Sequence, residues 1–533
     1  MTQHREDSLH DRPRRRRPRG QHPRRNRTEP IRANLGVRGG RVAEISRADL
    51  RGAQVIDATG LIVTPGFIDL HSHADFRIQG HPQASTQLPQ GVTTLVGGNC
   101  GFSPFPVADL EAMRTSSAFL EPELGWEWTD PGGFADAVDA AGPAINMVTQ
   151  VGHNALREAV MGGEQRLASD DDLAAMGELL ATAAAQGVYG FSTGLIYAPG
   201  TYSDERELQY LVSAAGRHGL LYSTHIRNEG ARLTEAVEEA IRLATAGGAR
   251  LQISHLKAAG ERHHGRTAEA LGLIDEAAEA GLDVAADVYP YTASSTTLTT
   301  RLPTWALDGG TAALLRRLAD TEARERILAE MRQGQATVAS GVMIAHLGPG
   351  RYQDAAGQSL AQIARSEGVD DAEATLRILA AHDGGASVVL HSMSDEDVDR
   401  VLAHPRVAVA SDGWVLRDQG RGRPHPRSFG TFPRVISHYV RERGLLTLPE
   451  AVRKMTSLPA SRLGWSDRGI LRAGSVADVA VFDPRTFTDN ATFSDPWRLA
   501  TGMHAVLVAG RVAFDGGEVT GVRAGTMLRA GSD

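Results

Sequence analysis

The chain has 533 residues, 41% of them hydrophobic, which is enough for more than one folded domain. Its net charge of −8 is unevenly spread, because residues 1–32 hold eleven arginines against four acidic residues and the remainder carries −15. A body this acidic argues against nucleic-acid binding outside the basic segment, and no apolar run reaches the roughly 18 residues that a membrane helix needs.

Two further features set expectations about compartment and redox chemistry. The basic N-terminus lacks the apolar stretch of a secretory signal, so we expect a cytoplasmic protein. Cys100 is the only cysteine, which excludes a disulfide within the chain. Its thiol is left as a core residue, a reactive nucleophile or a metal ligand.

Residues 1–32 are rich in arginine and proline and almost free of apolar residues. Such a composition cannot bury enough surface to fold, so we expect a disordered tail. A binding protein that uses this basic arm on nucleic acid or on a partner is the non-enzymatic alternative. The sequence does not set the oligomeric state.

Short strand-like segments follow in residues 33–62 and return in residues 466–533, which predicts a small β-sandwich or β-barrel domain assembled from both ends of the chain. The expected strands are Leu35 to Arg38, Arg41 to Ile45, Gln54 to Asp57, Ala477 to Phe482, Ala505 to Ala509 and Arg511 to Phe514.

Residues 63–465 alternate strand-like and helical segments, a pattern that favours a parallel sheet, and eight such strands would close a TIM-type (β/α)8 barrel. The expected helices include Asp170 to Ala185, Ser203 to Arg217, Leu233 to Thr245 and Ala268 to Ala280. The expected strands are Phe67 to His73, Gly91 to Gly97, Ile145 to Val151, Tyr189 to Gly194, Leu220 to His225, Leu251 to His255, Val284 to Val288 and Val407 to Ser411. Two more strand-like runs, Val342 to His346 and Ala386 to His391, do not fit the eightfold count, and we assign residues 293–350 to an insertion after the seventh strand.

Several of these predicted strands carry, at their carboxyl ends, side chains that commonly bind metals. His71 and His73 are two residues apart on the first strand, so both imidazoles point to the same side at its carboxyl end. Cys100 follows the second strand, and His225 and His255 end two later ones. Because barrel strands present their carboxyl ends at one pole, these donors should converge there, and imidazole with thiolate suits Zn²⁺.

Asp412 follows the last expected strand at the same pole. A carboxylate beside a metal can take a proton from water, whose pKa zinc lowers toward roughly 7, and can later deliver it to a leaving amine. We therefore expect Asp412 to act as general base and acid.

These residues resemble the amidohydrolase superfamily, whose histidines on the first, fifth and sixth strands and aspartate on the eighth match in type and order. The strand Tyr189 to Gly194 ends without the lysine of the dihydroorotase and hydantoinase group, whereas Gly97-Gly98-Asn99-Cys100-Gly101 is similar to the N-acyl-D-amino-acid deacylases. The resemblance implies a zinc-dependent hydrolase that acts on the linear amide of an N-acyl-D-amino acid and releases a carboxylic acid and a D-amino acid. A cyclic amide or imide hydrolase is the alternative within the hydrolases.

The resemblance also implies roles for individual residues. Cys100, His225 and His255 would hold one tight zinc ion, with His71 and His73 contributing to a second, weaker site. The small-molecule substrate carries a free carboxylate, which needs a cationic clamp, and an arginine can pair with it in a bidentate manner. The implied clamp is Lys257, Tyr289, Ser295 and Arg423, with Met393 against the amino-acid side chain.

Overall fold

The computed structural model describes residues 30–335, 337–417 and 419–531. The predicted disordered arm over residues 1–32 therefore lies almost entirely outside the described residues. No helix in the described part of the chain combines the length and the apolar character that crossing a membrane requires.

Eight parallel strands form the central sheet, in the spatial order β14-β10-β9-β8-β7-β6-β5-β4. Apart from Arg250 at the start of β9, every residue of these strands is buried, because both faces are covered, one by the barrel interior and the other by helices. All eight correspond to predicted strands, which confirms the barrel. Their bounds are β4 (Phe67–Asp69), β5 (Val92–Gly97), β6 (Asn146–Gly152), β7 (Gly190–Gly194), β8 (Leu221–His225), β9 (Arg250–Ile253), β10 (Val284–Val288) and β14 (Val407–Val409).

The first and last strands meet just beyond their carboxyl ends. Ser72 forms a parallel bridge with Gly413. The backbone N–H of Asp412 donates to His71 O at 2.7 Å, and that of His73 donates to Gly413 O at 2.8 Å. These contacts close the barrel where residues of the predicted site lie.

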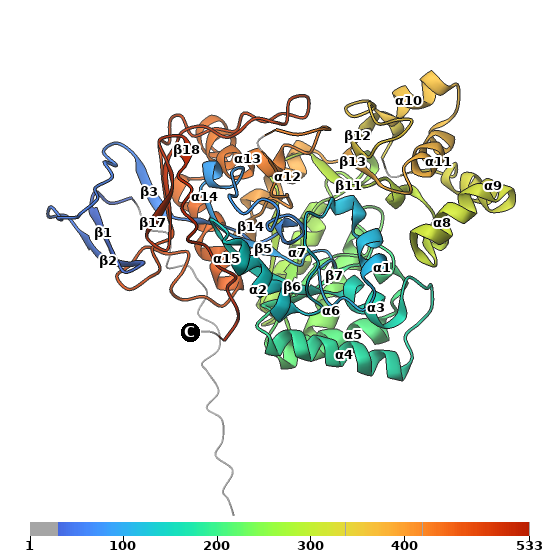
Figure 1. Cartoon of the computed structure of the whole chain (residues 1–533), viewed down its shortest axis with the longest axis horizontal. Helices are drawn as coiled ribbons and strands as arrows, with labels where there is room; N and C mark the ends of the chain where they lie inside the picture. The colour runs from blue at the N-terminus through green and yellow to red at the C-terminus, as the bar shows by residue number, and fades with distance from the viewer. Residues whose placement is uncertain (1–29, 336, 418, 532–533) are drawn as a thin grey trace, which may run out of the picture.

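Helices pack along the outside of the barrel (Figure 1). Helix α4 (Asp170–Ala185) begins at a capping box formed by Ser169 and Asp172. Helix α6 (Leu233–Gly247) buries one side at spacings of three and four residues. The other α-helices outside the insertion in the described part of the chain are α1 (Leu110–Ser116), α2 (Pro131–Ala141), α3 (His153–Met161), α5 (Glu205–Arg217), α7 (Thr267–Glu279), α12 (Asp395–Ala403), α13 (Arg427–Arg434), α14 (Leu448–Met455) and α15 (Ser457–Arg462).

A second sheet of five antiparallel strands joins the two ends of the described chain. Strand β3 (Ile62–Pro65) pairs with β15 (Val479–Phe482), and β16 (Met503–Val508), β17 (Arg511–Asp515) and β18 (Glu518–Val519) follow in order. A separate hairpin, β1 (Asn34–Arg38) with β2 (Arg41–Ser46), lies beside it. The strand predicted over Gln54 to Asp57 is wrong, because Asp57 accepts the N–H of Thr59 in a turn and β3 takes the sheet position instead.

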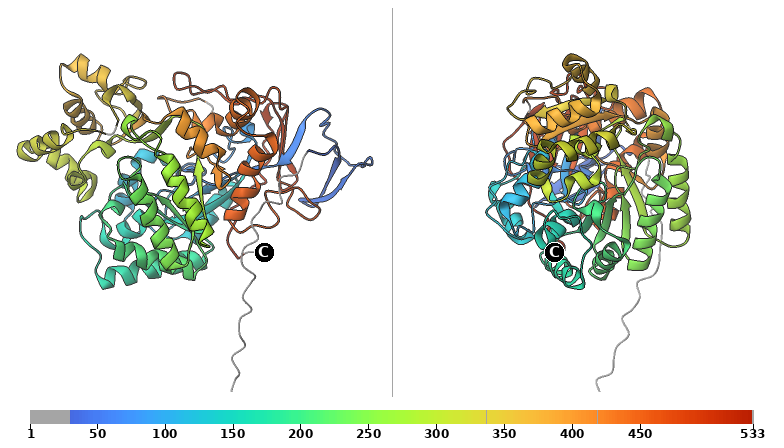
Figure 2. Two further views of the ribbon diagram at one scale, coloured as in Figure 1. Left: turned by 180° about the vertical axis from the view of Figure 1, so that it is seen from behind. Right: turned by 90° about the vertical axis from the view of Figure 1, so that its right-hand side faces the viewer.

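The insertion after β10 reaches His391, beyond the predicted end at residue 350. It contains helices α8 (Gly310–Ala319), α9 (Thr321–Met331), α10 (Leu360–Glu367) and α11 (Asp371–Ala381). Strand β13 (Ala386–His391) pairs with both β11 (Ala293–Thr297) and β12 (Val342–Leu347), so the two strand-like runs left over from the eightfold count belong to one sheet. The insertion has its own apolar core and projects from the barrel at the end opposite the β1–β2 hairpin (Figures 1 and 2).

Candidate metal centre

Six predicted site residues lie at the carboxyl ends of barrel strands and are buried there. They are His71 and His73 after β4, Cys100 after β5, His225 at the end of β8, His255 after β9 and Asp412 after β14. Five separate strands thus present donors at one pole of the barrel, as the sequence predicts.

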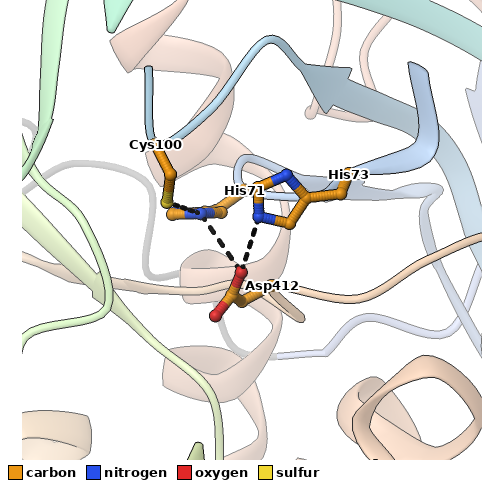
Figure 3. A group of neighbouring side chains, drawn as sticks. All are labelled: His71, His73, Cys100 and Asp412. Atoms are coloured by element: carbon orange, nitrogen blue, oxygen red, sulfur yellow. Dashed lines mark hydrogen bonds and ion pairs between the residues drawn. The ribbon is translucent and has the colours of Figure 1, made fainter. Parts of the chain in front are cut away.

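The thiol of Cys100 points toward the ring of His71, and the rings of His71 and His73 both face Asp412 (Figure 3). Cys100 also lies close to His255. Its Sγ is 3.3 Å from His71 Nε2 and 3.5 Å from His255 Nε2. Asp412 Oδ1 is 3.4 Å from His71 Nε2 and 3.1 Å from His73 Nε2. The ring of His225 packs edge-on against that of His255, with centroids 4.3 Å apart.

These donors form two sets that could each hold a metal ion, and Cys100 belongs to both. One set is Cys100, His225 and His255; the other is His71, His73, Cys100 and Asp412, and within each set the ligand atoms lie within 4.8 Å of one another. Among the described residues, neither ring nitrogen of the buried His225 has a hydrogen-bond partner. Because a buried nitrogen without a hydrogen bond is costly, and because thiolate with imidazole suits zinc, the residues fit this metal.

The electrostatics favour the thiolate, which is the form that binds metals. Burial alone raises the pKa of the Cys100 thiol, but His71 and His255 outweigh it and hold the pKa well below its usual range. Burial lowers the pKa of His225, which keeps this imidazole neutral. For His73 burial is outweighed by the hydrogen bond to Asp412, which raises the pKa to about 9.

Three of the site residues adopt the left-handed backbone conformation that non-glycine residues rarely take, with φ of +54° at Cys100, +36° at His255 and +51° at Asp412. Each such residue costs about 1–3 kcal/mol, and such strain gathers at functional sites. The turn before Cys100 also needs Gly98, because a Cβ there would lie 2.1 Å from Gln150 O. The backbone is therefore shaped to aim these side chains inward.

The predicted substrate residues lie around this centre, with one exception. Lys257 Nζ is 2.8 Å from His255 Nδ1. The hydroxyl of Tyr289 donates to Met393 Sδ at 3.9 Å, and Ser295 lies on β11. Arg423 is instead exposed and donates to Ser494 O at 2.6 Å, so the structure does not bring it to the site.

A different arginine lies at the centre. Arg427 is buried, and its NH1 donates to Asp412 Oδ2 at 2.7 Å. Its guanidinium lies 5.1 Å from the ring centroid of Tyr289, and its NH2 donates to Ser295 O at 3.4 Å. Several arginines occupy the segment after Asp412, and no spacing rule selects one of them. Arg427 is distinguished by its position as the first residue of α13.

Two carboxylates behind the histidines carry no role in the sequence prediction: Asp287 is buried and Glu229 is partly buried. Glu229 forms an ion pair with Lys257, and its Oε1 lies 3.1 Å from His255 Nδ1. Asp287 Oδ1 lies 3.2 Å from His71 Nδ1. The only sequence signal for Glu229 is its spacing of four residues after His225.

A model of the amidohydrolase family matches residues 54–514. The chain belongs to the amidohydrolase family. It is 36% identical over 500 residues to N-acyl-D-aspartate deacylase from Alcaligenes xylosoxydans xylosoxydans, covering 93% of this chain and 91% of the relative. It is also 36% identical over 498 residues to D-aminoacylase from the same organism, covering 93% of both chains.

Solved structures give the same placement. N-acyl-D-glutamate deacylase from Bordetella bronchiseptica, solved with zinc and a phosphonate mimic of the tetrahedral intermediate, matches with a TM-score of 0.81 and 35% identity, covering 95% of this chain and 97% of that one. The resemblance to the N-acyl-D-amino-acid deacylases is therefore confirmed. A D-hydantoinase matches at 18% identity with a TM-score of 0.53, which supports a shared fold but not the cyclic amide alternative.

Proposed function

We propose that this amidohydrolase hydrolyses the amide bond of N-acyl-D-amino acids and uses zinc to do so. The observation that carries the proposal is the meeting of one thiol, four imidazoles and Asp412 at the carboxyl pole of the barrel. Relatives that cover more than nine-tenths of the chain are deacylases of N-acyl-D-amino acids. Both lines point to the same reaction class.

The metal would be held by Cys100, His225 and His255, with a second, weaker site at His71 and His73 that shares the Cys100 thiolate. A bound zinc ion supplies Lewis acidity, which polarises the scissile carbonyl and lowers the pKa of water. The surroundings are buried, so bulk water is excluded and electrostatic effects on the reacting amide are strengthened.

Asp412 would move the proton. Burial alone raises the pKa of its carboxyl group, but Arg427 and His71 hold it well below its usual range, so Asp412 is ionised and able to accept a proton. It takes one from the attacking water, whose oxygen bonds to the amide carbon. When the carbon–nitrogen bond breaks, the same proton passes to the departing nitrogen. The products are a carboxylic acid and a D-amino acid.

Arg427 replaces Arg423 in our assignment of the carboxylate clamp, because it is the guanidinium that lies beside Tyr289, Ser295 and Asp412. Lys257 would add a second positive charge to this clamp. Met393, which contacts Tyr289, would line the space for the amino-acid side chain. Binding the substrate carboxylate to a fixed cation places the amide at a defined distance from Asp412.

A chiral screen tests the proposal. Purified protein is incubated with N-acetyl derivatives of D- and L-amino acids, including aspartate, glutamate and methionine, and zinc is measured in the same preparation. We expect release of acetate from D-enantiomers only, lost on zinc removal and restored by zinc. Equal hydrolysis of L-enantiomers, or turnover independent of metal, would contradict it. We also propose a cytoplasmic location, which cell fractionation would test.

A further inference from the structure

Asp287, on strand β10, lies beneath the candidate ligands and is 1% exposed. Its Oδ1 accepts the backbone N–H of His255 at 2.7 Å and lies 3.2 Å from His71 Nδ1. Its Oδ2 accepts from Gln252 Nε2 at 2.8 Å. One carboxylate therefore touches a member of each candidate ligand set.

The contact with His71 sets which ring nitrogen carries the proton. A carboxylate only accepts hydrogen bonds, so the proton of a neutral His71 lies on Nδ1, facing Asp287. The lone pair then lies on Nε2, which is 3.3 Å from Cys100 Sγ and 3.4 Å from Asp412 Oδ1. This is the tautomer that a metal ligand on the Nε2 side needs.

The contact with His255 acts on the backbone instead. His255 adopts φ +36°, and its N–H is held by Asp287 Oδ1. The next N–H, that of Leu256, donates to the backbone carbonyl of Asp287 at 2.9 Å. Together these bonds fix the strained turn that brings His255 Nε2 to 3.5 Å from Cys100 Sγ.

Two further side chains fix the orientation of Asp287. Arg462 donates to Gln252, and Gln252 donates to Asp287, so each hydrogen bond in this series can have only one donor. Arg462 Nε donates to Gln252 Oε1 at 3.2 Å, and Arg462 NH2 donates to Leu251 O at 2.8 Å. Because a guanidinium can only donate, the carboxamide of Gln252 must turn its oxygen toward Arg462 and its NH2 toward Asp287. All three side chains are buried.

We propose that Asp287 is the positioning residue that holds His71 and His255 in their metal-binding orientations, with Gln252 and Arg462 fixing its own orientation. The proposal rests on the zinc centre proposed above. It adds that both ligand sets depend on a single buried carboxylate that does not itself touch the metal or the substrate.

The first test is Asp287→Asn, with zinc affinity of the apoprotein measured by competition against a chromogenic chelator. The carboxamide oxygen still faces His71 and His255, but its NH2 now meets the NH2 of Gln252. If the carboxamide of Gln252 rotates by 180°, its NH2 group faces the guanidinium of Arg462 instead, so two donors still oppose each other. We expect zinc affinity to fall about 10- to 100-fold, the range seen when a partner of a ligating histidine is lost. Wild-type affinity in this variant would overturn the proposal.

A compensating change separates orientation from a general effect on structure. In the Asp287→Asn background, Gln252→Glu supplies a carboxylate that accepts from both Arg462 and the new carboxamide. Each of these hydrogen bonds then again joins a donor to an acceptor. We expect this double variant to recover at least half of the lost affinity on a logarithmic scale. A double variant as weak as Asp287→Asn alone would overturn the orienting role.

Two further variants complete the design. Asp275→Asn is the matched control, because Asp275 Oδ2 lies 3.1 Å from His404 Nε2 in another histidine–carboxylate pair, away from the site, and zinc affinity should not change. If Asp287→Asn fails to fold, Gln252→Met removes the hydrogen bonds that link Arg462 to Asp287 while keeping the charge of Asp287. Reduced zinc affinity in that variant supports the proposal and unchanged affinity overturns it. If the wild-type protein itself binds no zinc, the proposed function fails instead.

Discussion

The guanidinium of Arg427 donates to Asp412 Oδ2 at 2.7 Å, and both side chains are buried. The pair places a cation near both the proposed base and Tyr289, whose ring centroid is 5.1 Å from the guanidinium. A substrate carboxylate that reaches this guanidinium would therefore bring its amide close to Asp412. Recognition and proton transfer are joined in one buried ion pair.

Replacement of Arg427 is predicted to weaken the reaction through substrate recognition. For Arg427→Met we expect kcat/KM to fall about 10- to 100-fold, since a hydrogen bond to a charged group contributes about 1.5–3 kcal/mol. Arg423→Met is the matched control, because Arg423 lies exposed, and kcat/KM should stay within about threefold of wild type. Steady-state kinetics on an N-acetyl-D-amino acid measure both. A larger fall in kcat/KM for Arg423→Met than for Arg427→Met would instead assign the binding of the substrate carboxylate to Arg423.

Asp412→Asn is predicted to remove proton transfer while sparing the tight metal set. We expect kcat to fall about 10²- to 10⁴-fold, the range for loss of a general acid–base residue. Bound zinc should persist, because Cys100, His225 and His255 form a set without Asp412. Turnover and zinc content are measured on one preparation. Turnover near the wild-type rate would refute the assignment of Asp412.

A buried ion pair away from the site predicts a pH-dependent stability effect. Glu207 Oε1 lies 2.7 Å from His153 Nε2, and Oε2 forms an ion pair with Arg157. Burial alone raises the pKa of Glu207, but His153 and Arg157 lower it below its ordinary value. A depressed carboxyl pKa stabilises the fold above the unfolded pKa of about 4.3, and this contribution is lost as the pH falls through the folded value.

Glu207→Gln should therefore destabilise the protein by about 3–5 kcal/mol at pH 7, because it leaves the buried Arg157 without its carboxylate. The deficit relative to wild type should start to shrink as the pH falls below about 4.3, where Glu207 of the unfolded chain takes up a proton, and should be smallest below the lower folded pKa, where the native side chain is neutral too. Thermal unfolding of the wild type and the variant, at pH 7 and at a pH below about 4.3, measures this difference in stability. A deficit of equal size at both would contradict the assigned ion pair.

The sequence predicts the barrel and its ligand pole because both depend on local patterns. A strand with period two fixes the relative direction of His71 and His73, and carboxyl ends of parallel strands share one pole. The contacts of Asp287 and Glu229 depend on the register between strands and on the path of the chain after His225, which no single-segment pattern encodes. Register decides which carboxylate faces which ring nitrogen.

Two other differences have equally physical causes. In the segment after Asp412, Arg423 and Arg427 are both plausible from composition, and only the start of α13 brings Arg427 inward. The insertion extends past residue 350 because β13 pairs with β11 across about ninety residues, and such non-local pairing leaves no trace in a short window.

The variant Cys100→Ala tests the shared metal centre most directly. Its zinc content is measured by elemental analysis, and its hydrolysis of an N-acetyl-D-amino acid is measured on the same preparation. Cys100 belongs to both candidate ligand sets, so we expect the variant to lose bound zinc and turnover together while its thermal unfolding stays cooperative. A folded variant that retains zinc at the wild-type ratio and hydrolyses the substrate at the wild-type rate would contradict a centre built on this thiolate.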